Sequence, residues 1–330
     1  MHIPDGFLNA PTAIACGILA TAGVGMALHS AARSLPPKKV PLLGLSAAFV
    51  FAAQMLNFPV VGGTSGHLIG AVLCAVLLGP GAAVTIMTSV LILQCFLFAD
   101  GGLTALGANL FNMALVAPIV GFGVYRGVVR MLGTDLRALL AGTAFGAWCS
   151  TVAAALACAG ELATSGVVSW QAVVPAMGFV HVLIGCGEAV ITALVVAFVV
   201  RARPELLPGR EPCAGENGDW TLTGYGVVLA LGLVLFVSPF ASRWPDGLER
   251  IATDLGFAHQ ATPVPVFPSP LPDYSVPGVV SPAWATILAG VTGLLLAFML
   301  AFLLGSGLSR SRWAMGAAFP AGTDRVPPAG

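Results

Sequence analysis

Charged side chains are scarce in this chain. Aspartate, glutamate, lysine and arginine make up only 8% of its 330 residues, whereas hydrophobic residues make up 57%. Soluble globular domains carry about 25% charged residues, so this composition excludes an ordinary soluble fold. It indicates a protein that crosses a lipid bilayer several times.

An excess of positive charge is also missing. The 14 basic and 14 acidic residues balance, and no run of basic side chains is interleaved with aromatic ones. Proteins that bind nucleic acid need a basic patch to neutralise phosphates. We therefore expect no nucleic-acid partner.

Several motifs of enzymes and metal cages are absent. No G-x-x-x-x-G-K-[ST] phosphate loop occurs, so the sequence gives no sign of a P-loop ATPase. Ser65 stands near His67, but no G-x-S-x-G or H-E-x-x-H accompanies the pair, so an intramembrane hydrolase is the least favoured class. The seven cysteines form no C-x-x-C pair, and we interpret them as small buried residues. We expect no catalytic residue, no bound cofactor and no cleavable signal peptide.

Nine apolar runs dominate what is present. Each is long enough, or nearly so, to span a bilayer as a helix, and they predict an all-α, polytopic membrane helix bundle. We expect a seven-span unit at 1–203, a proline-bearing cytoplasmic linker at 204–221, a two-span unit at 222–309 and a cytoplasmic tail at 310–330. The runs lie at 10–32, 41–57, 67–80, 82–99, 106–125, 137–160, 175–200, 222–240 and 283–305.

The basic residues predict the orientation. Nine spans place the termini on opposite sides of the membrane. With Met1 outside, every lysine and arginine except Arg243 and Arg250 lies in the cytoplasm, as the positive-inside rule requires. We therefore expect an external N-terminus and a cytoplasmic C-terminus.

The first two residues form a potential chelate. The Met1 amine, the His2 amide nitrogen and the His2 ring nitrogen Nδ1 can close two fused rings around one metal ion and leave one planar position empty. Planar nitrogen sites suit Ni(II) or Cu(II), and Co(II) less well. His2 is bulky, so we expect Met1 to be retained, and residues 3–8 read as a turn. The alternative is a histidine at a frayed terminus.

His67 can supply the fourth nitrogen. In the predicted topology the glycine-rich loop 57–67 lies on the same side as Met1, and His67 opens the third apolar run. A lone histidine is more often a hydrogen-bonded helix-end residue than a metal ligand, so its pairing with His2 carries the hypothesis. Three acidic residues could collect cations at the mouth of this site or simply form turns: Asp5, Asp100 and Asp246.

A second pair of ionisable residues lies inside the seventh span. His181 and Glu188 are seven residues apart and share one helical face. A carboxylate inside the bilayer costs about 2.5–3.5 kcal/mol on insertion scales, so a role in a proton or solute path is one hypothesis. The other is an internal hydrogen-bonded clasp with Asn109, Asn112 or Gln94.

Four segments together carry a family resemblance. They are MHIPDGFL at 1–8, the loop 57–67, DGGLTALGAN at 100–109 with Asn112 and Met113, and HVLIG at 181–185 with Glu188 and Ala189. They resemble the CbiM/NikM family, the substrate-binding S components of energy-coupling-factor (ECF) transporters for cobalt and nickel. PDGLE at 245–249 resembles the accessory N component, so the whole chain is similar to a fused MN protein.

The resemblance implies a function and partners. It implies a metal held in a square plane by the Met1 amine, the His2 amide and ring nitrogens, and His67. It further implies a plasma-membrane importer of Ni(II) or Co(II) that works with a membrane T component and ATPase subunits. The alternative is a secondary metal or solute carrier that uses Glu188 and His181, although no duplicated half is visible. The choice of metal and the role of the 241–282 loop stay open.

Overall fold

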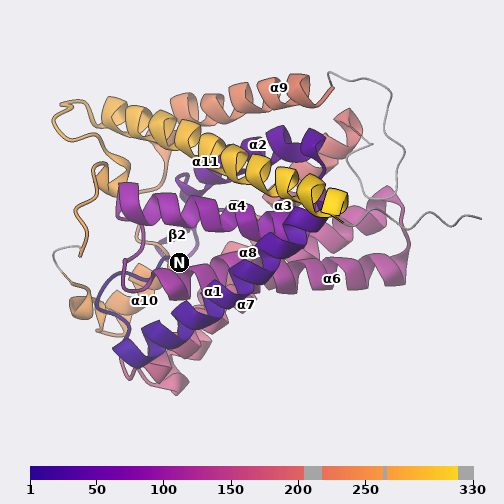
Figure 1. Cartoon of the computed structure of the whole chain (residues 1–330). Coiled ribbons are helices and arrows are strands. Elements are labelled where there is room, and N and C mark those ends of the chain that lie inside the picture. Colours follow the sequence, from indigo (N-terminus) through magenta and orange to yellow (C-terminus); the bar gives the residue numbers. More distant parts are fainter. Residues whose placement is uncertain (204–217, 263–265, 319–330) are drawn as a thin grey trace, which may run out of the picture.

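The structure is a computed structural model that describes residues 1–203, 218–262 and 266–318. It is a bundle of helices with one small hairpin (Figure 1). All nine apolar runs form helices, which confirms the predicted fold class. The main helices are α1 (Ala10–Ser34), α2 (Val40–Gln54), α3 (Ala71–Leu78), α4 (Pro80–Leu93), α6 (Ala117–Leu132), α7 (Leu136–Thr164), α8 (Trp170–Ala202), α9 (Gly218–Gly232) and α11 (Pro282–Ala318).

Among the described residues, seven helices are long and apolar enough to cross a membrane. They comprise α1, α4 with its π-helical extension η2 (Gln94–Phe98), the continuous α5–η3–α6 unit, α7, α8, the α9–η5–η6 unit and α11. In the fifth run, α5 (Leu106–Asn109) and the π-helical η3 (Leu110–Val116) lead into α6. The chain is therefore a multi-pass membrane protein.

The second and third apolar runs give helices that are shorter than the sequence predicts. Helix α2 has 15 residues and α3 has eight. Helix α3 is bounded by Gly70 and Gly79, whose positive φ angles break the helix at both ends. Most residues of both helices are buried, so the rest of the protein shields their ends from lipid and they need not span the bilayer.

The two C-terminal helices cover α2. Helix α11 packs along α2, and α9 lies beside it (Figure 1). Gly44 on α2 faces Phe298, and Gly290 on α11 faces Met55. Small residues of this kind allow helices to pack closely in a membrane. The C-terminal part of the chain therefore completes the burial of the short helix.

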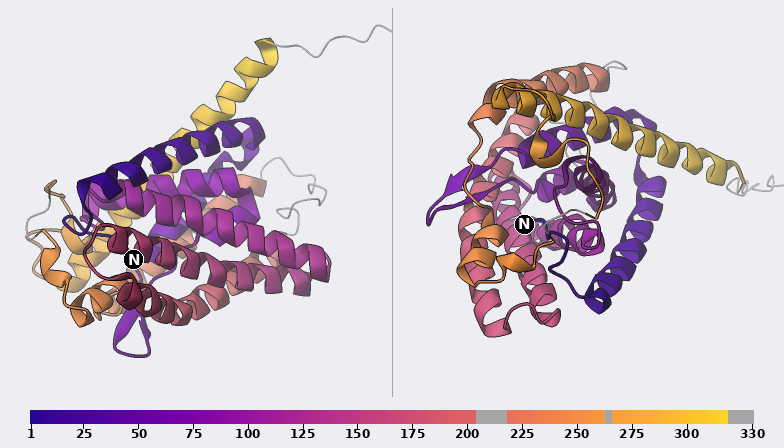
Figure 2. Two further views of the ribbon diagram at one scale, coloured as in Figure 1. Left: turned by 90° about the horizontal axis from the view of Figure 1, so that it is seen from below. Right: turned by 90° about the vertical axis from the view of Figure 1, so that its left-hand side faces the viewer.

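One end of the bundle gathers the segments that build the site, and we refer to it as the Met1 end. Viewed onto this end, the N-terminus lies near the centre of the ring of helices (Figure 2, right). Around it lie the antiparallel hairpin of β1 (Phe58–Val60) and β2 (Thr64–Gly66) and the short helix α10 (Gly247–Asp254). Segments far apart in the sequence therefore meet around the first residue.

Two of the predicted segments fall largely outside the described residues. Of the expected linker 204–221, only 218–221 are described, and they already belong to α9. Of the expected tail 310–330, residues 310–318 are described, and they continue α11.

Candidate metal site

The N-terminal segment is inserted into the protein. Met1 is 5% exposed, Ile3 is fully buried and Phe7 is 3% exposed. These apolar side chains alternate with polar ones, so burying them fixes the backbone of the polar residues between them. The expectation of an ordered terminus is correct for this structure, and the frayed alternative is wrong.

Hydrogen bonds hold the segment on both sides of His2. The Ile3 amide donates to Oδ1 of Asn109 at 2.8 Å, and the Asn109 side-chain amide donates to the Ile3 carbonyl at 3.1 Å. The Gly102 amide donates to the same carbonyl at 2.8 Å. Further along, Oδ1 of Asp5 accepts from the amide and hydroxyl of Thr104 at 2.8 and 2.6 Å. Asp5 is therefore a structural residue.

The Met1 amine lies between a histidine and a carboxylate. Its nitrogen is 3.4 Å from Nε2 of His67 and 2.5 Å from Oδ2 of Asp246. Burial favours the neutral amine, but the Asp246 carboxylate outweighs burial and raises the pKa of the amine. Burial also opposes ionisation of Asp246, yet the amine lowers the pKa of this carboxyl group well below its usual range. The two groups form a buried ion pair.

His67 presents a free nitrogen to the amine. Its Nδ1 lies 3.2 Å from the carbonyl of Leu68, so a proton on Nδ1 leaves the lone pair on Nε2, toward Met1. Burial, together with the charge of the amine and His2, lowers the pKa of His67 to about 3. We predicted that His67 opens the third helix, and this is wrong: it lies between β2 and α3, which begins only at Ala71.

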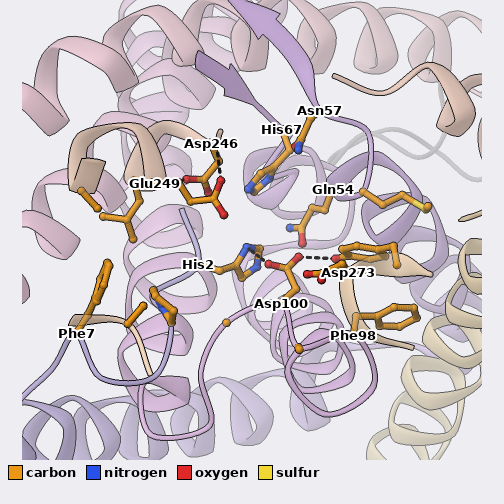
Figure 3. A pocket seen from close by; sticks show the side chains of 18 of the residues that line it. His2, Phe7, Gln54, Asn57, His67, Phe98, Asp100, Asp246, Glu249 and Asp273 are labelled. Carbon is orange, nitrogen blue, oxygen red and sulfur yellow. Dashed lines mark hydrogen bonds and ion pairs between the residues drawn. The ribbon is translucent and has the colours of Figure 1, made fainter. Parts of the chain in front are cut away.

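His2 stacks on His67 and binds a second carboxylate. The two ring centroids are 5.4 Å apart with 24° between the planes. Nδ1 of His2 lies 3.0 Å from Oδ1 of Asp100, and Tyr274 donates its hydroxyl to Oδ2 of Asp100 at 2.5 Å. Burial opposes ionisation of Asp100, but these contacts lower its pKa well below the usual range. Asp100 is therefore a fixed negative charge beside His2 (Figure 3).

A cavity of about 450 Å³ adjoins the two histidines. His2, His67, Asp100 and Asp246 line it, and their side chains converge in Figure 3. Partial burial and the charges of Asp246 and Asp100 raise the pKa of Glu249, another lining residue. These carboxylates therefore interact across the cavity, and the site attracts cations.

The PDGLE segment docks on the hairpin that carries His67. The Ser65 amide donates to the Pro245 carbonyl at 2.8 Å, and the Ser65 hydroxyl donates to the Trp244 carbonyl at the same distance. Asp246 then caps α10 in a capping box with Glu249. The cap and the hairpin together hold the Asp246 carboxylate against the Met1 amine.

His181 and Glu188 are buried on α8 but do not form the predicted clasp. Glu188 accepts from the amides of Ile69 and Gly70 at 2.6 and 2.9 Å, and Nδ1 of His181 lies 2.9 Å from the Met177 carbonyl. The expected partners Asn109, Asn112 and Gln94 are wrong, because free backbone amides at the start of α3 need an acceptor. Glu188 therefore holds the segment that follows His67.

Sequence reasoning missed three residues. Gln54 and Tyr274 line the cavity, and Glu161 accepts from Asn112 at 2.7 Å and from Cys16 at 3.3 Å elsewhere in the bundle. Two of them could have been found in the sequence. Gln54 is a polar residue inside an apolar run, and Glu161 is a carboxylate directly after the end of another apolar run. Tyr274 carries no signal in the sequence, since nothing in its loop indicates contact with Asp100.

The arrangement offers nitrogen donors to a metal ion. Among the described residues, no three His, Cys, Asp or Glu side chains gather closely enough to hold a metal, and the terminal amine and the backbone of His2 offer further nitrogen donors beside the two histidines. Adjacent ligands about 2.0 Å from a metal in a square plane lie about 2.8 Å apart. The observed 3.4 Å between the amine and His67 requires only a small adjustment.

Fold and site together define a class: a multi-pass helical membrane protein that buries its own N-terminal amine between His67 and Asp246, beside a second pair formed by His2 and Asp100. The family model for the "Cobalt uptake substrate-specific transmembrane region", CbiM, matches residues 2–206, and the PDGLE domain model matches residues 220–310. This chain belongs to the CbiM family and carries a PDGLE domain.

Curated relatives are similar over most of the chain. A putative fused nickel transport protein NikMN of Archaeoglobus fulgidus is 36% identical over 306 residues, which cover 92% of this chain and 98% of that protein. A fused nickel transport protein NikMN of Rhodobacter capsulatus is 35% identical over 281 residues. The aligned region covers 79% of this chain and 80% of that protein. These relatives are named as transport proteins, which is consistent with a transport component rather than an enzyme.

A solved structure resembles the N-terminal part of the fold. The crystal structure of a truncated transition metal transporter is 38% identical, with a TM-score of 0.56, and covers 61% of this chain and 99% of that chain. The match agrees with the helical membrane architecture described above.

Proposed function

We propose that this chain is the substrate-binding membrane component of an ECF-type importer of Ni(II) or Co(II). One observation carries the proposal: the Met1 amine, His2 and His67 lie together in a buried, cation-attracting site. Family membership and the nickel transport proteins among the relatives support the choice of cargo.

The proposed ligands are the Met1 amine, the His2 amide and ring nitrogens, and Nε2 of His67, in a square plane. In this arrangement Nδ1 of His2 gives up its contact with Asp100, and the amine gives up its ion pair with Asp246. Both carboxylates remain beside the bound ion and offset part of its charge. Planar nitrogen coordination and the Irving–Williams order favour Ni(II) over Co(II).

We propose a division of labour between two parts of the chain. Residues 1–203 form the metal-binding S component, and residues 222–309 form the N-like component with its external PDGLE loop. The matched ranges of the two family models support this division. The N-terminus faces outside and the C-terminus faces the cytoplasm of the plasma membrane, which the distribution of basic residues supports.

Transport requires partners that this chain lacks. A membrane T component and ATPase subunits supply coupling and ATP hydrolysis. The contacts of Glu188 and His181 argue against the alternative of a secondary carrier: both Glu188 oxygens bind backbone amides, and His181 Nδ1 binds a backbone carbonyl. These residues hold backbone in place and do not form a relay pair.

The test combines metal binding with uptake. Purified protein with an unmodified Met1 should retain one Ni(II) or Co(II) ion per chain, and cells should accumulate the metal only when the T and ATPase chains are present. Competition between the two ions identifies the preferred cargo. Uptake by this chain alone would instead indicate a secondary carrier, and absence of bound metal would reject the function.

A further inference from the structure

The cavity beside the nitrogen site has a chemistry of its own. Met1 does not line it, but His2, His67 and Asp246 do, so it extends away from the proposed nitrogen site and shares the two histidines with it. Four carboxylate side chains line it, and the described lining residues include no lysine or arginine: Asp100, Asp246, Glu249 and Asp273. Its electrostatic field therefore favours a cation.

The deep wall of the cavity carries an acceptor without a donor. Nε2 of Gln54 donates to the Ile69 carbonyl at 2.9 Å, which fixes the amide orientation and leaves Oε1 free. This oxygen is buried and has no partner, and Gln54 is only 3% exposed. Nδ1 of His2 contacts Asp100, and its other ring nitrogen, Nε2, is also buried without a partner.

Unpaired buried acceptors are costly, by about 1–3 kcal/mol each. The unpaired Oε1 of Gln54 therefore indicates a ligand that donates a hydrogen bond. In Figure 3 Gln54 points toward His2 and Asp100 and lies between the two histidines and Phe98. A donor placed there meets Oε1 of Gln54 and the carboxylates together.

A hydrated divalent cation fits this description. Water molecules bound to a metal direct their hydrogens outward, so the hydrated ion presents only donors and carries positive charge. Six waters occupy about 180 Å³, taking about 30 Å³ for each, and the cavity offers about 450 Å³. The hydrated ion therefore enters without losing its first shell.

We propose that the cavity is a second cation site, which holds a hydrated divalent transition-metal ion through hydrogen bonds from its water ligands to Gln54 and the surrounding carboxylates. The proposal rests on the proposed metal-binding function. The lining is graded: Glu249 and Asp273 are exposed, Asp100 and Asp246 are half-buried, and Gln54 is buried. The ion is captured by the exposed carboxylates and loses water only on reaching the nitrogens.

Two substitutions remove charge from the mouth of the cavity and preserve local structure. In Glu249→Gln, the new amide oxygen still accepts from the Asp246 amide in the capping box. In Asp273→Asn, asparagine tolerates the positive φ of 52° found there. The matched control is Asp254→Asn. Asp254 is an exposed carboxylate on the same short helix as Glu249, but it pairs with Arg250 and does not line the cavity.

The first experiment observes the cavity without the nitrogen site. Mn(II) prefers carboxylate and water ligands, so we would titrate it into the His67→Ala protein and follow its electron paramagnetic resonance. We expect the His67→Ala protein to bind one hydrated Mn(II) weakly. This binding should disappear when Glu249→Gln and Asp273→Asn are added, and it should remain when Asp254→Asn is added instead. The proposal is overturned if no Mn(II) binds, or if Mn(II) binds equally well with and without the two cavity substitutions.

The second experiment measures Ni(II) association with the His67-containing protein by stopped flow. We expect Glu249→Gln/Asp273→Asn to lower the association rate by about threefold to tenfold, with an unchanged dissociation rate and full final occupancy. Unchanged association rejects the second site and leaves the nitrogen site intact. Failure of the unsubstituted protein to bind Ni(II) rejects the proposed function instead, while the Mn(II) result still decides on the cavity.

Discussion

The Met1 amino nitrogen lies 3.4 Å from Nε2 of His67, although 66 residues separate them. Nothing local brings them together. The N-terminal segment is anchored by Asn109 and Asp5, and the His67 segment is held by Glu188 and the PDGLE loop. The following predictions test what this contact does.

Adding one residue ahead of Met1 should abolish metal binding. The extension removes the primary amine from its place between His67 and Asp246 and must enter a site where Met1 is 5% exposed. Metal content after gel filtration measures the effect, and a one-residue extension at the C-terminus is the control. Full occupancy in the N-terminally extended protein would show that the amine is not a ligand.

His67→Ala should lower metal affinity by at least about 100-fold, because even residues that only support a ligand contribute 10- to 100-fold. The matched control is His259→Ala, an exposed histidine near the same end of the bundle. Isothermal titration gives the affinity, and thermal unfolding in detergent checks the fold. Equal affinities in the two variants would remove His67 from the ligand set.

Metal affinity should rise steeply with pH. The ion displaces one proton from the amine, whose pKa Asp246 raises against the effect of burial, and one from the His2 amide. His67, with a pKa lowered to about 3, is already neutral. Below the pKa of the amine, two released protons give about a 100-fold gain in affinity per pH unit. A gain of about tenfold would exclude the amide, and constant affinity between pH 5 and 8 would reject the chelate.

Glu188→Gln should destabilise the fold more than it weakens metal binding. The carboxylate accepts from two amides, whereas the neutral carbonyl of glutamine accepts more weakly and its amino group cannot accept at all. We expect a loss of about 1–3 kcal/mol in the free energy of unfolding, with residual metal binding. Loss of metal as complete as in His67→Ala would assign Glu188 a direct role in coordination.

Tyr274→Phe should loosen Asp100 while keeping the aromatic packing. The ring stacks on Phe98 at 4.8 Å between centroids. The substitution removes the bond that the hydroxyl donates to Asp100 and the weaker one that it accepts from Nε2 of Gln94 at 3.0 Å. Hydrogen bonds to charged groups contribute about 1.5–3 kcal/mol, so unfolding should become easier by that amount. Tyr225→Phe, at a residue 70% exposed, is the control. An equal effect of both substitutions would mean that the bond to Asp100 contributes little.

The sequence predicted the helical bundle because apolar runs are a direct consequence of the lipid environment. It also indicated the chelate at Met1 and His2, since that feature depends on two adjacent residues. Shortening of α2 and α3 was not predictable from hydropathy, because burial inside the protein and burial in lipid select the same side chains. In the structure the positive φ angles of Gly70 and Gly79 end α3 on both sides.

The surroundings of the site depend on contacts between distant segments. Asp246 and Asp100 were possible cation collectors in the sequence, equally well explained by turns, and the structure gives each a specific partner in Met1 and His2. The hydrogen-bond donors to Glu188 were mispredicted because free backbone amides leave no trace in a sequence. Tyr274 could not be found, since its role depends on how its loop folds back.

The ion pair between Met1 and Asp246 has a consequence for biosynthesis. Because a chain is synthesised from its N-terminal end, Met1 meets its counter-ion Asp246 only after 245 further residues have been made. Until then the amine has no carboxylate at this position and remains open to acetylation or trimming. Completion of the PDGLE segment therefore decides when the terminus becomes sheltered, and a chain that stalls before residue 246 leaves it unprotected.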